Sequence, residues 1–202
     1  PRVEEVDLVV PPAPRLANRV IEIIDLEVER GGNVLVRDFN FEFCAKQRLG
    51  IVGPNGAGKT SLLRCLLGDL EPSAGEVKLG SLTKINYIDQ GRLSLNEEKS
   101  VFEEVGEGED FVIFGDQRLT LWSYLKRFLF TDERIRTPVS RLSGGERNRV
   151  LLAKNLKHGG NVLILDEPTN DLDLATLRVL EEALVAFGGT VLVVSHEGYF
   201  PN

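Results

Sequence analysis

A glycine-rich stretch that ends in a lysine and two hydroxyl side chains could hold phosphate. It reads GPNGAGKTS and fits the pattern G-x-x-x-x-G-K-[ST]. Glycines let consecutive backbone N–H groups turn toward an anion, and a helix that follows adds its positive dipole end. Lys59 supplies a cation for the β- and γ-phosphates, and the Thr60 hydroxyl can ligate Mg²⁺. The residues expected at the phosphates are Gly53, Pro54, Asn55, Gly56, Ala57, Gly58, Lys59, Thr60 and Ser61. This stretch predicts a nucleoside triphosphate site.

The elements around this stretch are those that a phosphate loop requires. The apolar run 49–52 predicts a strand that enters it, and the pattern of 62–67 predicts a helix that leaves it and stops at Gly68. This strand–loop–helix context disfavours a chance glycine loop. Upstream, the alternation of apolar and acidic residues over 20–30 predicts a half-buried strand, and 31–33 predicts a turn.

Three phenylalanines predict a further strand before the loop. Phe39, Phe41 and Phe43 fall on one face at a period of two, and we expect them to pack in the core rather than to line a cofactor site. Short strands are expected near 76–79 and 85–88. An antiparallel opening of this kind differs from the plain βα alternation of many phosphate-loop proteins.

The second half of the chain is predicted to be mainly helical, with two buried strands. Helices are expected at 101–105 and 121–130, separated by a hairpin of 111–114 and 117–120 that turns at 115–116. The residues 142–146 open an amphipathic helix with Val150, Ala153 and Leu156 on its buried face, closed by two glycines at 159–160. The remaining elements are a doubly buried strand at 162–165, a helix at 174–187 and a strand at 191–194.

Composition and charge exclude several classes of protein. The 202 residues are 42% hydrophobic and 27% charged, which suits one globular core. No apolar run approaches the roughly 18 residues of a membrane span, and nothing resembles a signal peptide. The net charge of −7 leaves no broad basic face for nucleic acid. A local cluster is either a nucleic-acid surface or a solvated helix face: Lys126, Arg127, Arg134, Arg136 and Arg141. Cys44 and Cys65 are expected to be small buried hydrophobes, which fits the reducing cytoplasm.

Six motifs in fixed order resemble the nucleotide-binding domain of the ABC ATPase family over about residues 20–200. They are GPNGAGKTS at 53–61, Gln90, LSGGE at 142–146, VLILDE at 162–167, the run Thr169–Asp173 and His196. The resemblance implies an α/β fold of the P-loop NTPase class, with a mainly parallel core sheet, an antiparallel β subdomain and a small helical subdomain. It also implies ATP and Mg²⁺ as cofactors and ATP hydrolysis as the activity.

The resemblance also assigns roles to single residues. Asp166 ends a buried strand and would hold Mg²⁺ through its water shell, together with Thr60 and Gln90. Glu167 would be the general base that activates water for attack on the γ-phosphate. His196 would contact that phosphate, and Gln90 would couple the site to the helical subdomain. The residues expected to face the ATP of an opposing domain are Ser143, Gly144, Gly145 and Asp173.

Two features resemble the ABC-F branch: LSGGE in place of LSGGQ, and the run Glu167–Asp173, EPTNDLD. Two segments, LSGGERNR at 142–149 and WSYLKRFLF at 122–130, are especially similar to the second, C-terminal ABC domain of the Uup-like members. The branch implies a cytoplasmic ATPase that closes on a second ABC domain, in tandem or as a second copy, and that acts on the ribosome. DNA is the alternative target, and the nucleotide-binding subunit of a transporter is the alternative function. No membrane partner is expected.

The same resemblance divides the chain and shows where it departs from the family. Residues 1–19 are expected to be the remnant of an interdomain linker, and 20–202 an ABC domain with its helical subdomain at about 91–158 and its C-terminal end missing. The absence of any Met favours a fragment. An aromatic residue that commonly stacks on adenine is replaced by Val28 and Arg30, so the preference for ATP over GTP rests on the resemblance. After His196 the family usually has Asp-Arg, and here the residues are Glu197 and Gly198.

Overall fold

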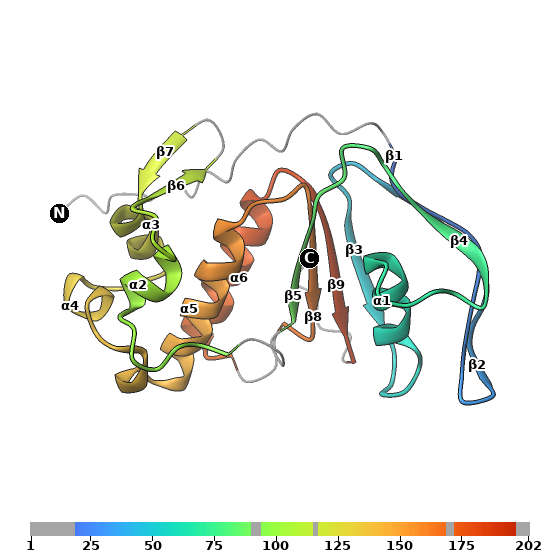
Figure 1. Cartoon of the computed structure of the whole chain (residues 1–202), viewed down its shortest axis with the longest axis horizontal. Coiled ribbons are helices and arrows are strands. Elements are labelled where there is room, and N and C mark those ends of the chain that lie inside the picture. Colours follow the sequence, from blue (N-terminus) through green and yellow to red (C-terminus); the bar gives the residue numbers. More distant parts are fainter. Residues whose placement is uncertain (1–18, 90–93, 115–116, 169–171, 197–202) are drawn as a thin grey trace. The chain divides into compact units, whose positions relative to one another are not determined.

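A three-stranded antiparallel sheet opens the chain in the computed structural model (Figure 1). Its strands are β1 (Arg19–Arg30), β2 (Asn33–Cys44) and β4 (Ala74–Leu79), in the order β2-β1-β4. The alternation that predicted β1 is confirmed most clearly in its second half, where Leu26 and Val28 are buried while Asp25 and Glu29 are exposed. The structure describes residues 19–89, 94–114, 117–168 and 172–196.

A second sheet has the parallel pairing expected of the core. Its strands are β3 (Arg48–Val52), β9 (Thr190–Ser195), β8 (Val162–Asp166) and β5 (Ile85–Asp89), in the order β3-β9-β8-β5. The pairs β3–β9 and β8–β9 are parallel. The predicted class, a mainly parallel core sheet with an antiparallel β part, is confirmed. Since the carboxyl ends of parallel strands share one edge, the residues after β3, β8 and β9 are brought together.

The helix α1 (Lys59–Leu67) packs its apolar face into a core shared with strands of both sheets. Leu63 and Leu66 of α1 lie in one cluster with Ile23 and Leu26 of β1 and with Ile164 of β8. These elements form one compact unit, whose described residues are 19–88, 160–168 and 189–196; we call it the phosphate-loop unit. Its packing fixes the start of α1 at the end of β3.

We call the other compact unit the helical unit. Its described residues are 89, 94–114, 117–159 and 172–188. Its elements are α2 (Val101–Gly106), β6 (Phe111–Phe114), β7 (Gln117–Thr120), α3 (Leu121–Arg127), α4 (Asp132–Ile135), a 3₁₀ turn (Val139–Arg141), α5 (Gly144–Lys157) and α6 (Leu174–Ala186). Val150 and Ala153 of α5 are fully buried, as predicted, whereas Leu156 is half-buried. The Tyr124 hydroxyl of α3 donates to the Ala153 carbonyl at 2.7 Å.

Two predicted details are wrong. The helix expected at 121–130 ends at Arg127, because Leu129 takes a left-handed backbone with φ 62°. The core packing expected of the three phenylalanines holds for Phe43, which is buried, and for Phe39, which packs against the core. It is wrong for Phe41, which is 38% exposed because β2 lies at the edge of its sheet. No helix among the described residues is long and apolar enough to cross a membrane.

Candidate functional site

The phosphate loop connects β3 to α1, as predicted. The Gly53 amide donates to the Ser195 carbonyl at 3.4 Å, which ties the loop to the end of β9. Gly58, the residue before α1, has φ 92°, and a β-carbon there would lie 3.0 Å from the Leu35 β-carbon. Glycine is required here because both the backbone and the space exclude a side chain. No side chain caps α1, so its first N–H groups are available to an external anion.

Lys59 places its ammonium group over the loop. Its Nζ donates to the Gly53 carbonyl at 2.5 Å and to the Pro54 carbonyl at 3.2 Å. The Thr60 side chain is exposed, so its hydroxyl is open to a metal ion, whereas Ser61 is buried. Phosphate oxygens satisfy an ammonium group as carbonyl oxygens do, so this arrangement fits a phosphate anion. These positions agree with the predicted roles of Lys59 and Thr60, which stay predictions without a bound nucleotide.

Glu167 lies at the junction of three elements. Its backbone N–H donates to the Val194 carbonyl at 2.8 Å, and its backbone has φ 51°, which is uncommon for a residue with a side chain. Its Oε2 lies 2.5 Å from Nδ1 of His196 and accepts from the His196 amide at 3.3 Å. Its Oε1 lies 3.9 Å from the Lys59 Nζ. The predicted base, the predicted histidine and the loop lysine therefore meet in one place.

Asp166 ends β8 next to Glu167. Its Oδ2 accepts a hydrogen bond from the Tyr87 hydroxyl of β5 at 3.2 Å. Tyr87 was not predicted as a site residue, since only the pairing of β5 in this sheet brings it near. No group of three or more His, Cys, Asp and Glu side chains within the described ranges could hold a metal ion. The donor set of a hydroxyl and one carboxylate fits Mg²⁺ that takes its other ligands from phosphate and water.

In the helical unit, the motif Leu142–Glu146 forms the start of α5. The Ser143 hydroxyl accepts from the Glu146 amide at 3.3 Å, and Glu146 accepts from the Ser143 amide at 2.8 Å, which is a capping box. Arg134 of α4 binds both Glu146 oxygens, at 2.6 and 2.5 Å. These hydrogen bonds, from Arg134 first, hold the pKa of Glu146 at about 2.

Asp173 packs against the same helix start. Its Oδ1 accepts from the Thr176 amide at 2.7 Å, which caps α6, and its Oδ2 lies 3.5 Å from Nη1 of Arg149. A β-carbon on Gly145 would overlap the Asp173 carboxylate. Thr176 also donates to the Gly145 carbonyl at 3.3 Å. Gly145 and Asp173, both predicted to face the ATP of an opposing domain, are thus in contact with each other, which the sequence spacing alone did not indicate.

We expect the free energy of unfolding of Gly145→Ala to lie about 1 kcal/mol below that of Gly144→Ala, because Asp173 must move and release its cap on α6. Gly144→Ala is the matched control, since a β-carbon there meets nothing within 4 Å and alanine favours a helix. Urea unfolding of both variants measures the difference. If the cost of Gly145→Ala persists in an Asp173→Ala background, the contact with Asp173 is not its cause.

The lowered pKa of Glu146 predicts a pH-dependent contribution to stability. A carboxyl group with a depressed pKa stabilises the fold fully above its ordinary value of 4.5, and that contribution is lost as the pH falls toward 2. The wild-type chain should therefore exceed Glu146→Gln in free energy of unfolding at pH 7, and the difference should shrink at pH 4 and pH 3. Glu133→Gln, at an exposed position of α4, is the control. A difference that grows on acidification would contradict the assignment.

Several predicted site positions lie outside the described residues. These are Gln90, the segment 169–171 of the predicted Thr169–Asp173 loop, the turn at 115–116, the linker 1–18 and the residues Glu197 and Gly198. Of the two residues at the expected adenine position, Val28 is buried in the core, whereas Arg30 is exposed. The Val28 side chain therefore cannot stack on a base, whereas the Arg30 guanidinium is open to one.

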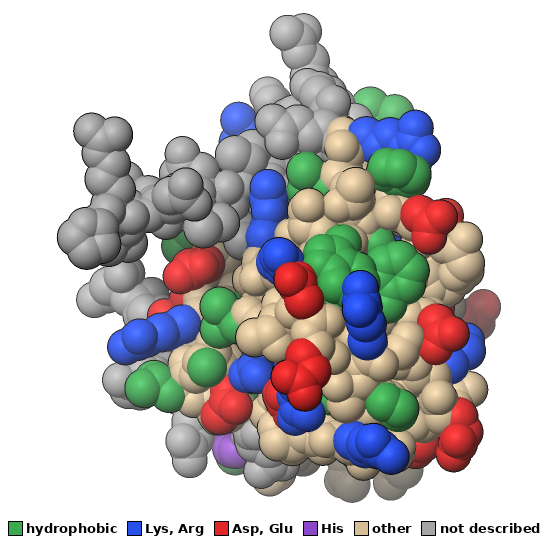
Figure 2. All heavy atoms as spheres, turned by 90° about the vertical axis from the view of Figure 1, so that its left-hand side faces the viewer, with side chains coloured by type: hydrophobic (Ala, Val, Ile, Leu, Met, Phe, Trp, Pro, Cys, Tyr) green, Lys and Arg blue, Asp and Glu red, His purple; other side chains and the backbone are tan. Residues whose placement is uncertain are grey.

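The cluster of basic residues at 126–141 is largely engaged by the chain itself. Lys126 pairs with Asp132 at 2.9 Å, Arg134 binds Glu146, and Arg136 lies over the Trp122 ring. Acidic and basic side chains are interspersed on the face of the protein shown in Figure 2. This mixture favours the interpretation as a solvated helix face over a nucleic-acid surface.

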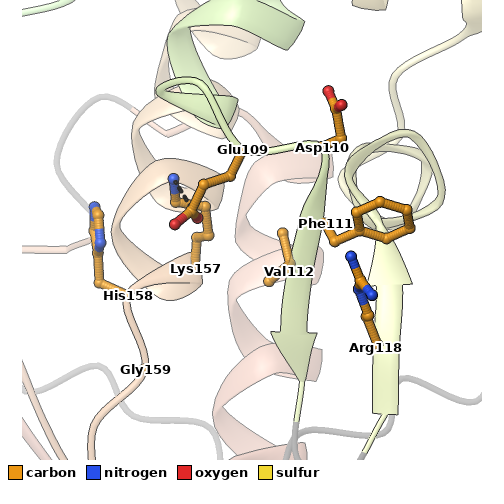
Figure 3. Close-up of a pocket in the computed structure, with 8 residues that line it drawn as sticks. All are labelled: Glu109, Asp110, Phe111, Val112, Arg118, Lys157, His158 and Gly159. Carbon is orange, nitrogen blue, oxygen red and sulfur yellow. Dashed lines mark ion pairs between the residues drawn. The ribbon is translucent and has the colours of Figure 1, made fainter.

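An open hollow of about 850 Å³ in the helical unit contains none of the predicted site residues (Figure 3). Its cations are satisfied internally, since Lys157 lies 3.2 Å from Glu107 and 3.7 Å from Glu109, and Arg118 lies over the Phe111 ring. His158 lies 3.2 Å from Glu107. Nothing in this lining is arranged for phosphate, so the hollow is not the nucleotide site.

Comparison with known proteins agrees with this geometry. The family model described as ABC transporter matches residues 36–170. The chain is 43% identical to the energy-dependent translational throttle protein EttA of Haemophilus influenzae over 199 residues, which are 98% of this chain and 36% of EttA. It is 47% identical to the ATP-binding protein Uup of the same organism over 182 residues, which are 90% of this chain and 28% of Uup. The chain spans about a third of the length of these relatives.

Solved structures show the same fold. A putative metal-chelate type ABC transporter in an inward-facing conformation matches with a TM-score of 0.68 and 25% identity, over 90% of this chain and 74% of that one. CbiO1 from Clostridium perfringens, part of the ABC transporter complex cbiONQ, matches with a TM-score of 0.67 and 23% identity, over 90% and 80% of the two chains. The predicted resemblance to ABC domains, and to Uup-like ABC-F proteins in particular, is confirmed, and EttA is a further relative.

Proposed function

Because this chain belongs to the ABC transporter family, we propose that it binds Mg²⁺-ATP at its phosphate loop and hydrolyses it to ADP and phosphate. The observation that carries the proposal is the meeting of three groups: Glu167 lies between Lys59 and His196 at the edge of the parallel sheet. A carboxylate held there, next to a cation for the γ-phosphate, is placed to act on an attacking water.

The proposed mechanism assigns each side chain one task. The Lys59 ammonium and the first amides of α1 bind the β- and γ-phosphates, and Thr60 and Asp166 would hold Mg²⁺, which neutralises phosphate charge when bound. Glu167 accepts the proton of a water whose oxygen attacks the γ-phosphorus, and the bond to the β-phosphate oxygen breaks. His196 orients the Glu167 carboxylate, and in the family the matching histidine contacts the γ-phosphate.

We propose that full activity needs a second ABC domain, in tandem or as a second copy. At the start of α5, Ser143 and Gly144 are exposed and Gly145 is half-buried, a surface suited to phosphate. They belong to a different unit from the phosphate loop. In the family these residues contact the ATP of an opposing domain. The relatives EttA and Uup are about three times as long as this chain, which leaves room for such a domain.

We propose the ribosome as the target of the intact protein, on the basis of the 43% identity to a protein named a translational throttle. The test uses the intact protein with Glu167→Gln and the matching change in the other domain, so that ATP stays bound. Co-sedimentation with ribosomes in ATP but not in ADP is expected. ATP-dependent retention on DNA without ribosome association would instead favour DNA, the alternative target.

A further inference from the structure

We infer that Arg134 is a positioning residue of the signature motif: it neutralises Glu146 and so lets a motif ending in an acid face phosphate. This inference rests on the proposed contact between Ser143–Gly145 and the ATP of an opposing domain. The observation behind it is the two-point contact of the Arg134 guanidinium with both oxygens of Glu146, at 2.6 and 2.5 Å.

Glu146 sets the geometry of the helix start but brings an unfavourable charge. Its carboxylate accepts from the Ser143 amide, while the Ser143 hydroxyl accepts from the Glu146 amide, so the first turn of α5 is fixed from both sides. A negative charge at this position also cancels part of the positive end of the helix dipole. That positive end is what Gly144 and Gly145 would present to a phosphate.

Arg134 removes this conflict. The Glu146 side chain is only 14% exposed, so its charge is weakly screened by solvent and a paired cation matters. With Arg134 bound, the pair is neutral as a whole, and the amides at the helix start keep their attraction for an anion. The motif then works electrostatically like one that ends in a neutral residue.

Local structure holds Arg134 in place. It belongs to α4, a single turn whose start is capped by Thr131, which accepts from the Arg134 amide at 3.3 Å. The next residue, Ile135, is completely buried, so the turn is anchored in the core of the helical unit. Arg134 is therefore delivered to Glu146 by a fixed backbone and not by a flexible surface loop.

Four variants of the intact protein test the inference by their steady-state ATP hydrolysis. Arg134→Met is expected to lower kcat about tenfold with little change in KM for ATP, because the phosphate loop is untouched. Glu146→Gln should stay within about threefold of the wild type. The double variant Arg134→Met/Glu146→Gln should recover to the same level, since no charge is left to neutralise. Lys126→Met removes the comparable surface pair with Asp132 and is the control.

A purely structural role predicts a different pattern. If Arg134 only braced the fold, the double variant would be as slow as Arg134→Met or slower, and that result would overturn the inference. A Glu146→Gln variant as slow as Arg134→Met would overturn it too. Thermal unfolding of the same samples shows which variants are folded. If Arg134→Met does not fold, the comparison of Glu146→Gln with the double variant decides between the two roles of Arg134. A wild type that hydrolyses no ATP refutes the proposed function, and the inference falls with it.

Discussion

Replacing Glu167 by Gln is expected to lower the rate of ATP hydrolysis by a factor of about 10² to 10⁴ while ATP remains bound. Glutamine keeps the size of the side chain and its contact with His196, but it cannot accept a proton from water. The phosphate loop, the start of α1 and Lys59 are unchanged, so ATP binding should be retained. Single-turnover hydrolysis of labelled ATP, with equilibrium binding measured alongside, separates the two effects.

Glu76→Gln is the matched control for this change. Glu76 lies in the same unit, is exposed and pairs with Lys78 on the surface of β4, so its removal should leave hydrolysis unchanged. Normal turnover by Glu167→Gln would show that another group activates the water. Loss of ATP binding together with turnover would show that Glu167 acts on the structure of the loop and not on the chemistry.

Lys59→Ala is expected to weaken ATP binding about 10- to 100-fold. The ammonium group donates to two carbonyls of the loop, and charge-assisted hydrogen bonds of this kind contribute about 1.5–3 kcal/mol each. Titration calorimetry with ATP measures the change in affinity directly. The expected effect is on Kd, because the lysine contacts phosphates in the ground state as well as during the reaction.

The control for Lys59→Ala is Lys78→Ala, which removes an exposed lysine whose partner is Glu76. It should leave the affinity for ATP unchanged and so exclude a general effect of net charge. An unaltered affinity in Lys59→Ala would contradict the assignment of the glycine-rich stretch as the phosphate site, whatever the effect on hydrolysis.

Local patterns in the sequence were enough to predict most elements and the phosphate loop. Each of these patterns reflects a requirement of a single segment. The alternation in β1 reflects burial on one face, the continuous apolar run of β8 reflects burial on both faces, and the glycines before α1 reflect the backbone of the phosphate loop. Glu167 and His196 were placed by family resemblance, and the structure brings them together because β8 and β9 are parallel neighbours.

Contacts between distant segments could not be predicted in this way. Tyr87 reaches Asp166 only through the strand order of the second sheet, and Arg134 reaches Glu146 only because α4 packs near the start of α5. The early end of α3 has a similar origin, since Phe128 and Phe130 are both buried and the chain turns sharply at Leu129 between them. Tertiary packing overrides the helical pattern there.

The central claim, that the signature of one copy serves the phosphate loop of another, is tested by two tandem fusions of this chain with a flexible linker. One fusion carries Lys59→Ala in the first copy and Ser143→Arg in the second; the other carries both changes in the first copy. Because the two fusions have the same composition, only the arrangement of the changes differs. We predict that the split arrangement hydrolyses ATP, since it keeps one intact composite site, and that the joined arrangement is inactive. The opposite result, activity only when both changes share one copy, would show that each copy uses its own signature and would contradict the account.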